Sequence, residues 1–171
     1  MAAPHVGERS TARPRWQTVL GGAAAFAALV GLYLTFSNPA LGGDHYAAAL
    51  SAWVIATTGS ADVSAFAVAR EGLWLFEVGD QVVTNRFAGA VLYAVPFYAV
   101  ASLFTSGFTM WPGIVAASVL AAVAVACIWA TVRPLGQRVA WGAAAVFGVG
   151  SATFAVSADT QWSHAPAQAA L

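Results

Sequence analysis

Three long apolar segments dominate the pattern of hydrophobic and polar positions along the chain. They cover residues 18–36, 112–132 and 139–156, and none of them contains a charged side chain. About 20 apolar residues in a helix are enough to cross a bilayer. The pattern therefore predicts three transmembrane helices. A cleaved signal peptide is the alternative for the first segment, but its apolar core is too long and no A-x-A cleavage motif follows it.

A fourth apolar segment, residues 87–104, is shorter and has Pro96 in its middle. The arginines that precede the first span place the N-terminus in the cytoplasm by the positive-inside rule. If residues 87–104 crossed the membrane, the arginine-bearing turn 133–138 would lie outside, against that rule. We therefore predict that residues 87–104 form a re-entrant or interfacial helix and that the turn 133–138 is cytoplasmic.

This topology divides the chain into a tail and a membrane domain. Residues 1–15 are polar and predicted to be a disordered cytoplasmic segment, and residues 16–171 form the membrane domain. An external loop covers residues 37–86, and a second external loop starts at residues 157–171. The predicted fold class is all-α integral membrane protein, with three transmembrane helices and one re-entrant or interfacial helix.

The first external loop has two predicted elements of its own. After the Gly42-Gly43-Asp44 break, apolar residues recur at helical spacing up to Gly59, which predicts a short amphipathic helix with Asp44 at or beside its N-cap. Gly79-Asp80 then separates two short apolar runs, 74–78 and 81–84, as the turn of a β-hairpin does.

Composition agrees with a membrane protein. Hydrophobic residues make up 60% of the chain and charged residues only 8%, against roughly 25% charged residues in soluble domains. Zero net charge, with seven arginines and no lysine, argues against nucleic acid as a partner. The single cysteine, Cys127, excludes an internal disulfide framework and a zinc site built from cysteines.

Two aspartates, Asp44 and Asp159, are the main candidates for chemistry. Each follows the outer end of a predicted span, where partial desolvation raises a carboxyl pKa toward the range of a general base. Helix capping is the alternative role for each. His45 and His164 lie near them in sequence, so a divalent metal site is conceivable, although the spacing matches no ligand motif and surface histidines are the favoured interpretation.

The external arginines are candidates for holding a phosphate, because guanidinium matches phosphate geometry. Arg70 is adjacent to Glu71, which favours an ion pair. Arg86 stands where the loop returns to the membrane and is the better candidate. Four tryptophans near span ends are interpreted as interfacial anchors, and glycines in the last span allow close helix packing; they are Trp16, Trp111, Trp129, Trp141, Gly142, Gly148 and Gly150.

The order of these parts resembles the N-terminal region of GT-C membrane glycosyltransferases. The resemblance rests on Gly43-Asp44-His45-Tyr46 after the first span, Thr84-Asn85-Arg86-Phe87 before a Pro-containing helix, and Ser157-Ala158-Asp159 after the last span. The branch with protein O-mannosyltransferases and aminoarabinose transferases is the most similar, in actinobacterial-type members. The chain departs from the family in having His45 where a second acid is common, and in lacking prolines beside Arg86.

The resemblance implies transfer of a sugar from a polyprenyl-phosphate donor to an acceptor at the outer face of the cell membrane, with inversion. Asp44 and Asp159 would be catalytic, and Arg86, His45, His164 and Tyr46 would bind substrate. Whether a metal takes part is left open. Family members are much longer, so we expect a fragment or truncated product that lacks C-terminal helices or needs a partner membrane protein. The alternatives are a non-catalytic membrane subunit that packs against partner helices and, less favoured, a transporter fragment, since no span has a central charge.

Overall fold

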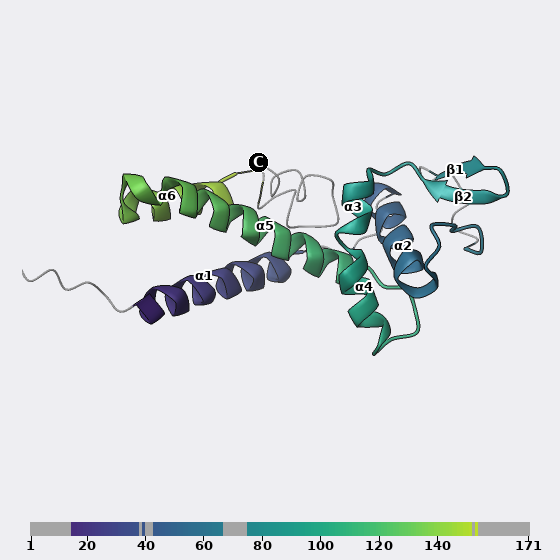
Figure 1. Cartoon of the computed structure of the whole chain (residues 1–171), viewed down its shortest axis with the longest axis horizontal. Coiled ribbons are helices and arrows are strands. Elements are labelled where there is room, and N and C mark those ends of the chain that lie inside the picture. The colour runs from purple at the N-terminus through teal and green to yellow at the C-terminus, as the bar shows by residue number, and fades with distance from the viewer. Residues whose placement is uncertain (1–14, 38, 40–42, 67–74, 152, 154–171) are drawn as a thin grey trace, which may run out of the picture.

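The computed structural model describes residues 15–37, 39, 43–66, 75–151 and 153. Its helices form two lobes, seen in Figure 1 at opposite ends of an elongated molecule. The three-helix lobe contains α1 (Arg15–Phe36), α5 (Trp111–Val132) and α6 (Gln137–Val149), with α1 and α6 both packed against α5. The hairpin lobe contains α2 (Gly43–Thr58), α3 (Ala88–Leu92), α4 (Val95–Ser102) and the strands β1 (Leu75–Val78) and β2 (Gln81–Thr84).

Within the described residues, one helix is long and apolar enough to cross a membrane. It is α5 continued by a 3-10 turn, Trp111–Leu135, and it confirms the predicted segment 112–132 as helical and apolar. The first predicted segment is also helical, since it lies within the 22 residues of α1. The apolar part of this helix, Gly22–Phe36, is shorter than the length required of a candidate membrane span. The expectation of three spanning helices is therefore supported for one of them.

The third predicted span, 139–156, is covered by a described helix only in its first part. Helix α6 has 13 residues and ends at Val149, a length of about 20 Å at 1.5 Å per residue. Gly150 and Ser151 follow directly, and both have low helix propensity, Gly because it loses the most backbone freedom on folding. The apolar character of the sequence continues beyond Val149, but residues 152 and 154–156 lie outside the described residues, so the predicted end of this span at residue 156 stays a prediction.

The predicted turn between the last two helices is confirmed. Arg133–Leu135 forms a 3-10 turn, and Gly136 has a φ of 122°, a conformation that residues with a Cβ rarely adopt. This geometry reverses the chain sharply, so that α6 returns along α5 (Figure 1).

The segment around Pro96 forms two short helices instead of one. Helix α3 ends at Leu92, and α4 starts at Val95 with Pro96 as its second residue. Proline has no N–H to donate and its ring clashes with the carbonyl four residues earlier, so a continuous helix is broken here. The segment is too short to rank as a spanning helix, in agreement with the prediction that residues 87–104 do not cross as one helix.

Helix α2 forms where the sequence predicted it and ends before Gly59, which has a φ of 74°. Its surroundings differ from those expected of an amphipathic surface helix. Six consecutive residues, from Ala47 to Ala52, are buried, so the helix is covered on all sides along its middle. The alanines and Ser51 between the large apolar residues are small enough for other elements to pack closely on that side as well.

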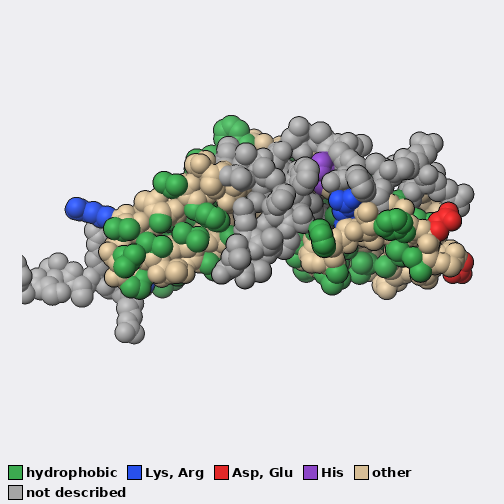
Figure 2. Space-filling model, turned by 90° about the horizontal axis from the view of Figure 1, so that it is seen from above, with side chains coloured by type: hydrophobic (Ala, Val, Ile, Leu, Met, Phe, Trp, Pro, Cys, Tyr) green, Lys and Arg blue, Asp and Glu red, His purple; other side chains and the backbone are tan. Residues whose placement is uncertain are grey.

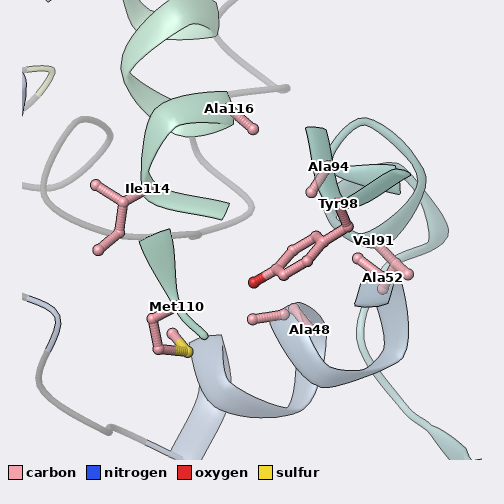
Figure 3. Close-up of a cluster of buried hydrophobic side chains, with 9 residues drawn as sticks. Ala48, Ala52, Val91, Ala94, Tyr98, Met110, Ile114 and Ala116 are labelled. Atoms are coloured by element: carbon pink, nitrogen blue, oxygen red, sulfur yellow. The ribbon is translucent and has the colours of Figure 1, made fainter. Parts of the chain in front are cut away.

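Tyr98 of α4 links α2 to the start of α5. Figure 3 shows its ring in the space between Ala48 and Ala52 of α2 and the Met110–Ile114 region of α5. The side chain is buried and its hydroxyl donates a hydrogen bond to the carbonyl oxygen of Thr109 at 3.0 Å. Tyr98 thereby fixes the hairpin lobe to the helix of spanning length.

The predicted β-hairpin is confirmed. Strands β1 and β2 pair antiparallel with Val78 opposite Gln81, so that Gly79 and Asp80 form a two-residue turn. Gly79 has a φ of 65°, which this tight turn requires and glycine adopts without strain. The hairpin packs on α2 through Leu75 and Val82, which contact the buried side chains of Leu50 and Val54.

Candidate functional site

The predicted site begins at the first turn of α2. The helix starts at Gly43, so the backbone of Asp44 lies in the first turn, where the N-terminal end of the helix dipole favours a negative charge. His45 follows and is half-buried. Asp44 is therefore the second residue of the helix, whereas the sequence predicted it at or beside the N-cap.

Tyr46, predicted to bind substrate, contributes its ring to the hydrophobic packing of the hairpin lobe. Its ring meets that of Phe108 edge to face, with centroids 5.2 Å apart, and it contacts the buried residues around α2. Phe108 in turn touches Trp53 and Tyr98, so four aromatic residues pack together beneath the start of α2. This aromatic packing holds the first turn of α2 in a fixed position.

Arg86 lies between β2 and α3, two elements that both contact α2. Its Nε donates a hydrogen bond to Oδ1 of Asn85 at 3.1 Å, and its backbone N–H donates to Oγ1 of Thr84 at 3.2 Å. The side chain is half-buried. Asn85 thus orients one edge of the guanidinium, a group whose geometry suits phosphate or carboxylate oxygens.

The fold brings Asp44, His45 and Arg86 into one lobe, at the end where α1 finishes and α5 begins. Asp159 and His164 lie outside the described residues, as do Arg70 and Glu71, so their predicted roles stay predictions. Among the residues that the structure describes, no group of three or more His, Cys, Asp or Glu side chains could hold a metal ion.

The charged side chains differ between the two ends of the described structure, and Arg86 adds a basic side chain within the hairpin lobe. Figure 2 shows acidic side chains at the tip of the hairpin lobe and a basic side chain at the opposite end of the three-helix lobe. The exposed acids of the hairpin are Glu77 and Asp80, and the exposed arginines of the α5–α6 turn are Arg133 and Arg138. The two ends are separated by the length of α5.

Sequence reasoning gave no role to Asp62, which the structure shows to be the organising residue of the loop after α2. Its carboxylate accepts hydrogen bonds from the backbone N–H of Ser64 at 2.9 Å and of Val82 at 3.0 Å, and from the Ser64 hydroxyl at 2.9 Å. The bonds from Ser64 and Val82 lower the pKa of Asp62 below its ordinary value. The Asp-x-Ser pattern was the available signal, since aspartate commonly accepts from the N–H two residues ahead.

The described residues thus hold the backbone of Asp44, the imidazole of His45 and the Asn85-bonded guanidinium of Arg86 in the same lobe. No protein-family model matches the chain, and no curated protein or solved structure matches it either.

Proposed function

We propose that the chain is embedded in the cell membrane, with α1 and α5 crossing it and the α5–α6 turn in the cytoplasm. The 22 residues of each helix extend about 33 Å, close to the roughly 30 Å of a bilayer core. Arginines at one end and acids at the other support this orientation, because positive charge is retained in the cytoplasm. In this proposal α6 and the residues after it form the third crossing.

Within that frame, we propose that the chain is the N-terminal segment of a glycosyltransferase that moves a sugar from a polyprenyl-phosphate donor to an acceptor at the outer membrane face. The observation that carries the proposal is the position of Arg86, oriented by Asn85 in the same lobe as the Asp44-His45 helix start. A cation for the lipid phosphate and a base for the acceptor are the two groups that such a transfer needs at the membrane surface.

In the proposed reaction, the Asp44 carboxylate takes the proton of the acceptor hydroxyl. The acceptor oxygen forms a bond to the anomeric carbon while the bond from that carbon to the phosphate oxygen breaks on the opposite face. The electron pair leaves with the polyprenyl phosphate, whose negative charge Arg86 stabilises. The configuration at the anomeric carbon is inverted. Asp159 would act as the second catalytic acid from the second external loop, and His45 and His164 would bind substrate.

The test uses membranes that contain the native gene product and a polyprenyl phosphate carrying a radiolabelled sugar, with loss of label from the lipid fraction as the readout. Asp44→Asn removes the general base and should slow transfer by about 100-fold or more. Immunoblotting of the membrane fraction verifies that the variant is still produced and inserted.

Asp80→Asn is the matched control, because Asp80 is an exposed acid of the same lobe at the hairpin turn. We expect its transfer rate to equal that of the unmodified protein. Arg86→Gln should weaken donor binding and Arg86→Lys should restore part of it. Unchanged transfer in Asp44→Asn would remove Asp44 from the mechanism, and no transfer by the native gene product would favour the non-catalytic membrane subunit.

A further inference from the structure

A large apolar groove runs between the three helices of the three-helix lobe, away from the proposed sugar-transfer site. Its volume is about 990 Å³, at the upper end of the roughly 300–1,000 Å³ found for ligand pockets. Each helix contributes apolar side chains to its walls, among them Phe26 and Leu29 of α1, Ala126 and Trp129 of α5, and Trp141 and Ala145 of α6. Alanines on the facing sides of α5 and α6 leave this space open.

The groove becomes polar at the end near the α5–α6 turn. Gln137 lines it there, and the indole Nε1 of Trp129 is buried with no hydrogen-bond acceptor among the described residues. The indole N–H can only donate, so a buried one without an acceptor is a costly feature that a bound oxygen would relieve. The ring of Trp141 is 5.5 Å from that of Trp129, so the two indoles close this end together.

Two arginines flank the same end. The guanidinium carbon of Arg133 lies 5.1 Å from the centre of the Trp129 ring, and Arg138 directly follows Gln137. Both side chains are exposed. The groove therefore combines a long apolar channel with a cationic mouth that carries a hydrogen-bond donor.

From this combination we infer that the groove binds an anionic phospholipid of the cytoplasmic leaflet, with an acyl chain between α1, α5 and α6 and the phosphate against Arg133 and Arg138. Basic pockets between membrane helices on the cytoplasmic side are typical sites for anionic headgroups. Charge selects this occupant over a further transmembrane helix, which would fill the apolar part but would leave the two arginines and the Trp129 N–H without an anion.

This inference rests on the membrane orientation proposed above and is independent of sugar transfer. Sugar transfer and lipid binding are measured by different assays. The protein could therefore be found to transfer sugar without retaining a lipid, or to retain a lipid without transferring sugar, and each result would test one proposal alone.

The test is native mass spectrometry of the purified full protein after equilibration with mixed micelles of equal phosphatidylglycerol and phosphatidylcholine. We expect one retained phosphatidylglycerol, preferred over phosphatidylcholine by roughly tenfold, since two arginines act near the headgroup. Arg133→Gln combined with Arg138→Gln should remove most of this preference, and the corresponding double Lys variant should keep it.

A second pair of variants locates the lipid in the groove. Ala126→Phe places a ring in the groove and should reduce retention of both lipids, whereas Cys127→Phe, one residue along α5 and exposed, does not point at the lining and should leave retention unchanged. Equal retention of the two lipids in the unmodified protein would overturn the proposal. So would a preference that survives both the double Gln substitution and Ala126→Phe, because binding would then lie elsewhere.

Discussion

At the scale of single residues, Asp62 shows how one carboxylate can hold a loop to a hairpin. Its carboxylate accepts a hydrogen bond from the backbone N–H of Ser64, two residues ahead. It also accepts one from the backbone N–H of Val82, twenty residues ahead in the sequence. The carbonyl oxygen of Val82 in turn accepts a hydrogen bond from the backbone N–H of Val63, which is buried. The hairpin that leads to Arg86 is thus fixed to the segment after α2 by hydrogen bonds at both the N–H and the carbonyl oxygen of Val82.

We predict that Asp62→Ala loosens the hairpin without unfolding the three-helix lobe. Loss of the carboxylate leaves the Val82 amide without its acceptor, and amide hydrogen exchange at Val82 should become roughly tenfold faster. Asp80→Asn, at the turn of the same hairpin, is the control and should not change the exchange rate at Val82. Equal protection in Asp62→Ala would contradict the role assigned to this carboxylate.

The same bonds predict a pH dependence. Because the folded-state pKa of Asp62 is lowered, the ionised carboxylate stabilises the loop–hairpin contact. This contribution is fully present above the ordinary carboxyl pKa of about 3.9, and it is lost as the pH falls through the lower folded-state value. Exchange protection of Val82, corrected for the intrinsic rate, should be constant from neutral pH to about pH 5 and should fall below about pH 4. A fall that begins near neutral pH would point to another group.

At the scale of elements, the packing of α6 depends on one glycine. The carbonyl oxygen of Gly148 accepts a hydrogen bond from the Tyr33 hydroxyl of α1 at 2.9 Å. A Cβ at this position would come within 3.0 Å of Cγ2 of Val125 on α5 and within 3.4 Å of the Tyr33 hydroxyl. Gly148 is therefore the point where all three helices of the lobe meet.

We predict that Gly148→Ala destabilises the protein in detergent by about 1–3 kcal/mol, the cost of overpacking a filled interior. Gly142→Ala is the matched control on the same helix, since nothing lies within 4 Å of its added Cβ. Its effect should be neutral or stabilising by up to about 1 kcal/mol. Denaturation in mixed micelles, followed by circular dichroism, compares the two variants, and equal stabilities would contradict the close contact at Gly148.

At the scale of the whole molecule, the separation of charges between the two ends gives the orientation proposed above a direct test. In a Cys127→Ser background, Asp80→Cys and Leu135→Cys each provide one thiol at an exposed position, one at either end. A maleimide reagent that cannot cross membranes should label intact cells at position 80 and should label position 135 only after permeabilisation. Labelling of both positions in intact cells would exclude the proposed topology.

Much of the local structure was predictable from the sequence. Glycine at positions 59 and 79 ends a helix and allows a tight turn because few other residues adopt positive φ, and Pro96 prevents a continuous helix through its missing N–H. These are local steric effects, and they do not depend on what surrounds the chain. The helix that begins around Asp44 and the loop position of Arg86 follow from the same local signals.

The environment of each element was decided by the tertiary structure. Hydropathy reports how apolar a segment is, but lipid and protein interior are both apolar. The hydropathy pattern therefore did not show that α2 is enclosed by protein along its middle. It also did not show that α6 ends at Val149. Gly148 and Gly142 are both flanked by apolar residues in the sequence, yet only a Cβ at Gly148 would meet Val125 and Tyr33. The sequence by itself determined a helical, membrane-type chain with its turns and breaks in place. The packing of distant segments determined that Asp62 became a structural residue, because its carboxylate meets the backbone N–H of Val82 only in the folded chain.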